Sequence, residues 1–282
     1  MKEKLTDNTR FLAGLMAAVI AILYTPMFIN LYNWWEKDPN YGHALFIPLA
    51  SAFLVWQKRK VLKEIPQEPC QGVGIFLFAV GLLMYVVGSR IEMFRLCIIS
   101  FLIVAFAFVF FFYGKRMARK LLFPIGFMVF MIPIPRLDDL TAPLKLLASK
   151  ASAGFLSLIR LPVYREGNII YLPNFTLEVA TVCSGLKSLV LIATLSVFYG
   201  YIVLPRILQR VVLFLLSIPI AILANIARII AVGWLSEMVG ARVLFQIIHD
   251  FSGVFVFIIA GALLALTTRM IEKCKFLKSS TG

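Results

Sequence analysis

Residues 211–232 read VVLFLLSIPIAILANIARIIAV, a run of 22 residues in which Arg228 carries the only charge. At a rise of about 1.5 Å per residue, a helix of this length crosses a hydrocarbon core that is roughly 30 Å thick. Asn225 lies one turn before Arg228 in the same run. We therefore predict a membrane-spanning helix that carries an amide and a guanidinium close to its second end.

Similar apolar runs recur along the whole chain of 282 residues. Hydrophobic residues make up 61% and charged residues 15%, with a mean hydropathy of +0.92. Soluble domains carry about 25% charged residues, so lipid must cover much of this surface. We predict an all-α integral membrane protein, one polytopic domain over residues 1–282, with about eight transmembrane helices at 11–32, 42–56, 73–89, 96–113, 121–135, 184–204, 211–232 and 250–268. The spans 42–56 and 121–135 are short and contain proline, so either could be tilted or re-entrant.

The net charge of +14 comes from 28 Lys and Arg residues that punctuate the apolar runs. Such placement is typical of topology signals rather than of a nucleic-acid surface. Segments 1–10, 57–72, 114–120, 205–210 and 269–282 hold 17 of these cations, and the intervening segments hold 9. The rich and poor segments alternate across eight spans. We therefore predict that both termini, about 1–10 and 269–282, face the cytoplasm of an inner-membrane protein and that no nucleic acid is a partner.

The longest connection, about 136–182, falls on the extracytoplasmic side by this count. Its first part, from Leu137 to about Ile159, mixes apolar and polar residues at helical spacing, which predicts a helix lying at the membrane interface. Its second part, Val163 to Ala180, places Glu166-Gly167-Asn168 between β-prone runs and predicts a short hairpin. A connection of this length usually has a function.

Three reactive side chains are predicted at one membrane face. Cys183 lies where the outer loop enters the span 184–204, Arg228 lies near the outer end of 211–232, and His249 opens the span 250–268. A thiol at a helix start is favoured as thiolate, an imidazole exchanges protons near neutral pH, and a guanidinium stabilises an oxyanion. The conjunction indicates cysteine-based acyl chemistry.

Three supporting candidates surround this set. Asn225 could orient Arg228 or donate to the oxyanion, and Lys187, one turn below Cys183, could acidify the thiol. His43 also lies at the outer face and competes with His249 as the base, and topology alone does not choose between them. The other cysteines are Cys70, Cys97 and Cys274, and no sequence feature near them favours a reactive thiolate. The four cysteines show no CxxC spacing and the chain has two histidines, so we expect no metal and no cofactor.

At these residues the sequence resembles the exosortase/archaeosortase family of membrane transpeptidases. One matching block is Cys183-Ser184-Gly185-Leu186-Lys187-Ser188, with lysine where arginine is common in the family. The other blocks are Ile218-Pro219 through Leu223-Ala224-Asn225-Ile226-Ala227-Arg228, then His249-Asp250-Phe251-Ser252-Gly253, and a weaker one, Tyr41-Gly42-His43-Ala44 through Pro48 to Trp56.

The resemblance implies that Cys183 is the nucleophile, that Arg228 activates it or stabilises the oxyanion, and that His249 rather than His43 is the acid/base. It also implies protein substrates whose C-terminus carries a Pro-Glu-Pro-type motif, an apolar helix and basic residues. The acyl group would pass to an acceptor nucleophile that the sequence does not identify, at the periplasmic side of the inner membrane, among membrane lipids.

Two other classes of protein fit parts of the pattern. In a transporter, Arg228 and Lys187 would line a polar path, but polar residues would then be expected deep in several spans, and here they gather at one face. In a non-catalytic scaffold of an export or polysaccharide system, Cys183 would be an inert small side chain. A reactive Cys183 thiol would favour the enzyme, whereas an inert thiol would favour the transporter or the scaffold.

Overall fold

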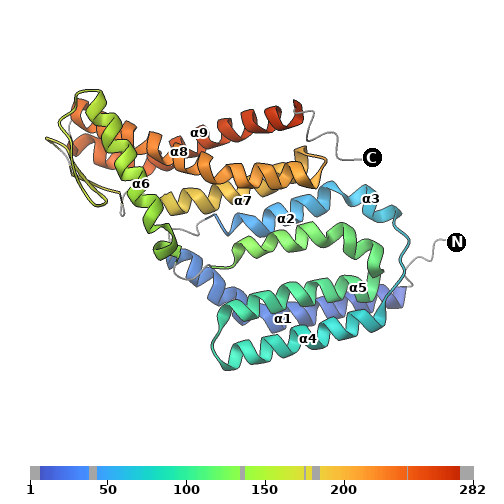
Figure 1. Ribbon diagram of the computed structural model, residues 1–282. Coiled ribbons are helices and arrows are strands. Elements are labelled where there is room, and N and C mark those ends of the chain that lie inside the picture. Colours follow the sequence, from blue (N-terminus) through green and yellow to red (C-terminus); the bar gives the residue numbers. More distant parts are fainter. Residues whose placement is uncertain are drawn as a thin grey trace. The chain divides into compact units, whose positions relative to one another are not determined.

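The computed structural model describes residues 7–37, 43–133, 137–174, 176–179, 185–239 and 241–273, which are mostly helical (Figure 1). The chain divides into two compact units, Met1–Ile134 (unit 1) and Pro135–Gly282 (unit 2). Each unit is built around its own set of packed helices.

Unit 1 consists of helices joined by short connections. In chain order they are α1 (Asp7–Lys37), α2 (Phe46–Gln57), α3 (Arg59–Glu64), α4 (Gln71–Arg90), α5 (Phe94–Phe127) and the 3-10 turn η2 (Met128–Met131). Inter-helix hydrogen bonds tie α1 to the rest of the unit. Tyr24 and Ser100 share a buried hydroxyl–hydroxyl bond, and the Trp35 indole N–H donates to the Met131 carbonyl at 3.3 Å. Such bonds satisfy polar groups that would otherwise face an apolar surrounding.

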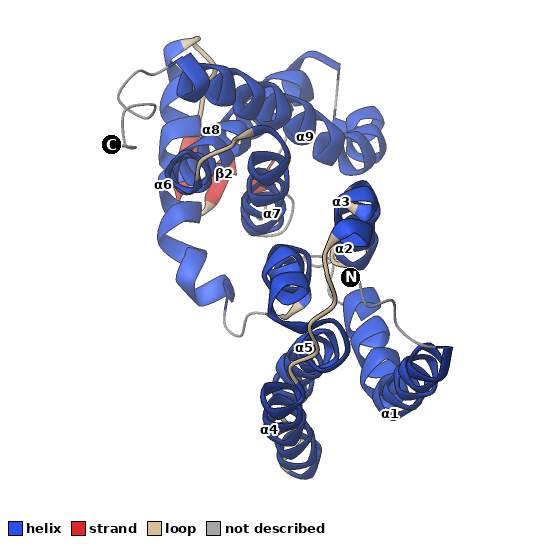
Figure 2. Cartoon of the chain, turned by 90° about the vertical axis from the view of Figure 1, so that its right-hand side faces the viewer, coloured by secondary structure: helices blue, strands red, loops and turns tan. Residues whose placement is uncertain are grey.

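Helix α5 is broken by a sharp reversal at Gly114, after which the chain runs back alongside its own first half (Figures 1 and 2). Gly114 has φ 80° and ψ −177°, a conformation that side-chain-bearing residues rarely adopt. A Cβ atom at this position would also lie 1.8 Å from the Glu68 carbonyl oxygen. The predicted spans 96–113 and 121–135 are therefore two arms of one helical hairpin, and the second continues through η2.

A stripe of glycines brings α4 against the first arm of α5. A Cβ atom added at Gly74 would lie 2.7 Å from Phe111, and one added at Gly81 would lie 2.6 Å from Val104. Gly88, one heptad further on, approaches Cys97 in the same way. Small residues at this spacing allow close contact between helix backbones, which is a common way for apolar helices to associate in lipid.

Unit 2 contains α6 (Leu137–Leu158), a small antiparallel sheet and a helical bundle. The strands are β1 (Tyr164–Glu166), β2 (Ile169–Tyr171) and β3 (Thr176–Glu178), in the order β1-β2-β3. Gly167, with φ 57°, and Asn168 form the turn between β1 and β2. The helix and the hairpin predicted for 136–182 are thus present, and a third strand extends the hairpin.

The bundle of unit 2 is formed by α7 (Gly185–Val203), α8 (Ile207–Val239) and α9 (Ala241–Lys273). Successive helices reverse direction, so the start of α7, the end of α8 and the start of α9 lie at one end of the bundle (Figure 1). Between the predicted spans 211–232 and 250–268, helix continues on both sides of residue 240, so both helices are longer than the predicted spans. The residues from 233 to 248 include no proline, and apolar residues recur among them at helical spacing, which favours the extension of both helices.

Two buried clusters hold unit 2 together. The bundle core joins α7, α8 and α9 through residues that include Ile192, Leu213, Ala224, Val256 and Leu264. The loop core joins α6 and the sheet to the second half of α8 through residues that include Leu156, Ile170, Leu177, Val179, Ile229 and Val232. The sheet and α6 therefore pack on the part of α8 that the bundle core leaves uncovered.

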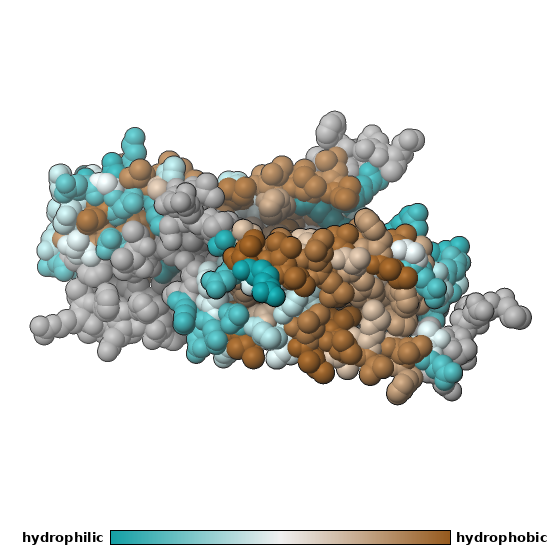
Figure 3. All heavy atoms as spheres, turned by 90° about the horizontal axis from the view of Figure 1, so that it is seen from below, coloured by the Kyte–Doolittle hydropathy of each residue, from teal (hydrophilic) through white to brown (hydrophobic). Residues whose placement is uncertain are grey.

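Helices long and apolar enough to cross a membrane occur at Asn8–Lys37, Gln71–Arg90, Phe94–Met131 and Ile207–Met238 within the described residues, with shorter apolar helices at Phe46–Gln57 and Ser188–Val203. On the face seen in Figure 3, apolar side chains form a broad patch bordered by hydrophilic ones. The chain is a helical membrane protein, as predicted. That it crosses the membrane about eight times with both termini inside stays a prediction.

Candidate active site

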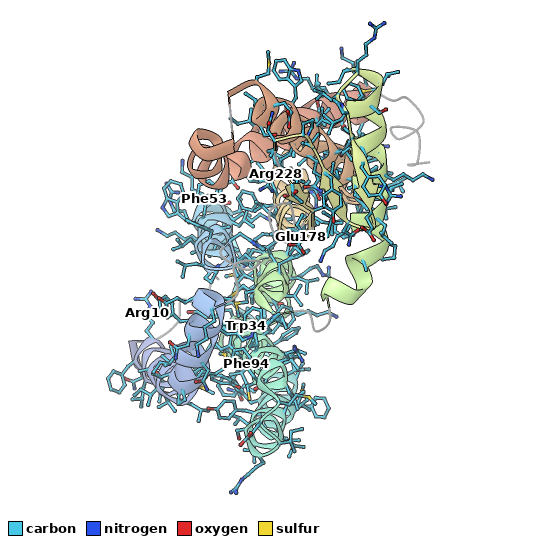
Figure 4. All side chains as sticks on the ribbon, turned by 90° about the vertical axis from the view of Figure 1, so that its left-hand side faces the viewer. Arg10, Trp34, Phe53, Phe94, Glu178 and Arg228 are labelled. Carbon is cyan, nitrogen blue, oxygen red and sulfur yellow. The ribbon has the colours of Figure 1, made fainter. Side chains whose placement is uncertain are left out.

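Arg228 lies on α8 at the boundary between the two cores of unit 2. Ala224, one turn earlier, belongs to the bundle core, and Ile229, the next residue, belongs to the loop core. The Arg228 side chain is half-buried and its Nε atom is buried. Arg228 therefore carries its guanidinium at the place on α8 where the two apolar cores adjoin. Its place on α8, with Glu178 of β3 in the same unit, can be followed in Figure 4.

Asn225 is almost fully buried, with 4% of its surface exposed. Its amide oxygen has no hydrogen-bond partner among the residues whose side chains the structure describes. A buried acceptor without a partner costs about 1–3 kcal/mol, so native proteins seldom keep one without a reason. Because Asn225 precedes Arg228 by three residues, both side chains lie on the same side of α8.

The backbone between these two residues is held by α6. The Ser152 hydroxyl, which is buried, donates to the Ile226 carbonyl at a long 3.5 Å. This contact, together with the loop core, fixes α6 across the turn of α8 that carries Asn225 and Arg228. No sequence pattern marks Ser152, because its partner is 74 residues away.

Cys183 lies outside the described residues, but both sides of its segment are anchored in the cores. Val179, four residues earlier, is fully buried in the loop core, and its N–H donates to the Asn168 carbonyl at 3.0 Å. Leu189, six residues later on α7, packs against the bundle core. The segment around Cys183 thus connects the same two cores that meet at Arg228.

Lys187 lies in the first turn of α7, two residues after its start at Gly185, and its side chain is outside the described part of the chain. His249 lies in the third turn of α9 rather than at a helix start, since α9 begins at Ala241. The backbone of His249 is described and its side chain is not. Val256, seven residues further along α9, belongs to the bundle core.

His43 belongs to unit 1, in the turn that precedes α2. Its carbonyl accepts the Phe46 N–H at 3.0 Å, and both imidazole nitrogens are buried. The two candidate bases therefore lie in different units, His43 in unit 1 and His249 in unit 2. Of the candidate residues, Asn225 and Arg228 are brought together with their side chains described.

No metal-binding cluster is present among the described residues, where no three His, Cys, Asp or Glu side chains are grouped to hold an ion. Cys70 is a half-buried free thiol and Cys97 a buried one. In unit 2, the candidate side chains that the structure describes are the Arg228 guanidinium and the Asn225 amide, which lie beside the two apolar cores.

A family model described as transmembrane exosortase matches residues 34–266 of this chain. The matched range includes every candidate residue discussed above, from His43 to His249. No curated protein and no solved structure matches the chain.

Proposed function

Because this chain belongs to the transmembrane exosortase family and is thus a membrane transpeptidase, we propose that it processes exported proteins at a C-terminal sorting signal, with Cys183 as nucleophile. The signal has a short Pro-Glu-Pro-type motif, an apolar helix and a basic end. The apolar helix lies in the bilayer, the basic end stays in the cytoplasm, and the motif reaches the periplasmic edge of the inner membrane.

One observation supports the assignment most strongly. Arg228 lies between Ala224 of the bundle core and Ile229 of the loop core, and Cys183 lies between Leu189 and Val179, which pack into the same two cores. Four residues of extended chain span at most about 14 Å, so Cys183 is within that distance of Val179. Because the residues on both sides of Cys183 pack into the two cores that adjoin at Arg228, we expect the Cys183 thiol to lie near the Arg228 guanidinium.

His249 fits the same end of the bundle. It precedes Val256 by two helical turns, roughly 10 Å along α9, and Arg228 follows Ala224 by one turn, roughly 6 Å along α8. Helices α8 and α9 run in opposite directions (Figure 1), so both residues lie beyond the bundle core toward the same end. The base assignment to His249 rather than His43 rests on the resemblance to the family.

The proposed reaction proceeds through an acyl-enzyme. The Cys183 thiolate attacks the carbonyl carbon of the scissile peptide bond, and the oxyanion that forms faces the Arg228 guanidinium. Protonated His249 gives its proton to the leaving amine, the C–N bond breaks, and the anchor helix departs with a new N-terminus. An acceptor amine then attacks the thioester, neutral His249 takes its proton, and the thiolate leaves.

The test is coexpression of the chain with a protein that carries such a tripartite signal, followed by mass spectrometry of the new C-terminus. Cys183→Ala should leave a folded protein and abolish processing, and Cys70→Ala, a second cysteine change, should process normally. Labelling with a membrane-impermeant thiol reagent should be fast at Cys183. Normal processing by Cys183→Ala would rule out the nucleophile, and an inert Cys183 thiol would favour a scaffold or a transporter.

A further inference from the structure

One end of unit 1 carries a strongly basic surface. It is formed by α3 with its flanking residues and by the first turns of α5 after Gly114. Residues 57–72 and 114–120 together hold eight Lys and Arg residues but two acidic ones, Glu64 and Glu68. Six exposed cations of these segments, called the basic surface below, are Arg59, Lys60, Lys63, Lys115, Arg119 and Lys120.

The fold places the two segments side by side, although about 50 residues separate them in sequence. Leu62 and Ile65, at and after α3, pack against the cluster that contains Met117 and Ala118 of α5. Glu68 forms an isolated bridge with Gly114, and its carboxylate pairs with Arg116 at 3.4 Å. With their apolar sides turned inward, both segments present their cations outward.

This surface lies where apolar helices end. Helix α2 stops at Gln57, α4 starts at Gln71, and both arms of α5 meet at Gly114. Trp56 and Val61 leave 58% and 52% of their surfaces exposed beside the cations. An aromatic ring and basic side chains at the ends of spanning helices mark the headgroup level of a bilayer.

One cation at this level, Arg59, is held in place by contacts with Trp56. The Arg59 guanidinium carbon lies 4.0 Å from the centre of the Trp56 ring, and an Arg59 N–H donates to the Trp56 carbonyl at 3.1 Å. A stacked, hydrogen-bonded guanidinium loses less freedom when it binds a phosphate than a free one does.

The charge distribution is unfavourable for the protein alone. Lys115, Arg116, Arg119 and Lys120 crowd the start of the second arm of α5, where like charges repel and the helix end is itself partly positive. The pair between Arg116 and Glu68 neutralises one of these charges, and both its side chains are more than half exposed. An anionic partner removes this repulsion.

We propose that the basic surface binds the headgroups of anionic phospholipids in the leaflet that it faces. Each Lys or Arg near such a leaflet contributes about a fivefold gain in affinity, so six act strongly together. The neighbouring Trp56 and Val61 favour a lipid over a soluble polyanion, since they meet acyl chains only when the phosphate belongs to a lipid.

The test uses the full-length protein in nanodiscs of phosphatidylcholine with or without phosphatidylglycerol, and native mass spectrometry to count retained lipids. Wild type should retain phosphatidylglycerol, and the combined variant Lys60→Gln, Lys63→Gln, Lys115→Gln and Lys120→Gln should bind it at least tenfold more weakly. The same positions changed to Arg should restore binding, because charge is kept. Thermal unfolding of the Gln variant at the wild-type temperature shows that its loss of binding is not loss of fold.

The matched control removes four exposed cations elsewhere: Lys37→Gln, Arg90→Gln, Lys150→Gln and Arg160→Gln. It should bind phosphatidylglycerol as wild type does. Equal weakening in both variants would overturn the proposal, because net charge rather than this surface would then govern binding. Displacement of the lipid by an equal concentration of inorganic phosphate would also overturn it, because the acyl chains would then contribute nothing.

Discussion

Asn174 donates two hydrogen bonds to the carboxylate of Glu237, one from its backbone N–H at 3.1 Å and one from its side-chain amide at 2.8 Å. The two residues are 63 positions apart, in the connection between β2 and β3 and in the last turns of α8. The pair fastens the sheet to the end of α8. Strand β3 precedes Cys183 in the sequence by five residues, so we expect this contact to influence where the proposed nucleophile is held.

Glu237→Ala should lower the rate of processing about three- to tenfold and reduce stability by about 1 kcal/mol, because both hydrogen bonds to Asn174 are lost. Asn174→Ala should cost less, since its backbone N–H remains. The measurements are single-turnover processing and thermal unfolding. Glu166→Ala, an exposed acid in the same sheet, is the control and should match wild type. Equal effects from Glu166→Ala would show that general surface charge matters rather than this contact.

Asn225→Leu should keep or raise stability, by up to about 1 kcal/mol, because it removes a buried amide oxygen that has no described partner. The same change should slow processing about tenfold if the amide serves Arg228 or the oxyanion. Thermal unfolding and processing are measured on one preparation. Ser217→Ala is a matched control on α8, since Ser217 is buried and already bonded to the Phe214 carbonyl at 2.6 Å. If the Asn225→Leu variant processes substrate at the wild-type rate, the Asn225 amide has no role in the reaction and the residue contributes to packing alone.

Arg228→Ala should reduce processing at least a hundredfold, because one lost oxyanion donor typically costs about 10²–10³ in rate. Arg228→Lys should recover part of this, since it keeps the charge and loses the planar fork of donors. The ratio of the two variants is read from initial rates on the coexpressed substrate, with Arg160→Lys as control. Full activity in Arg228→Ala would remove the guanidinium from the proposed mechanism.

Gly114→Ala should destabilise unit 1 by about 3 kcal/mol or more, because the methyl group would lie 1.8 Å from the Glu68 carbonyl oxygen in a backbone conformation with φ 80°. Gly126→Ala is the control on the same helix, since a Cβ there has nothing within 4 Å. It should be neutral or slightly stabilising. Thermal unfolding in one detergent compares the two. Equal stability of both variants would contradict the reversal at Gly114.

Local properties of the sequence were enough to predict the class of protein and the positions of most elements. Apolar runs separated by basic segments predict membrane helices, because a segment that crosses the hydrocarbon core must be long and nearly uncharged. Both are local properties of the sequence. The predicted interfacial segment is helix α6, and the Gly167-Asn168 turn joins two strands as expected, because turn chemistry is also local. The motifs around Cys183, Arg228 and His249 pointed to the family that the comparison then showed.

Which of these elements meet could be seen from the three-dimensional fold alone. The reversal at Gly114 depends on the close approach of Glu68, and the meeting of the two cores at Arg228 depends on α6 and β3 packing on α8. The extension of α8 and α9 to either side of residue 240 and the bond between Asn174 and Glu237 are of the same kind. Contacts between residues tens of positions apart leave no periodic signal, because each partner's local pattern is satisfied equally well by lipid, water or another helix.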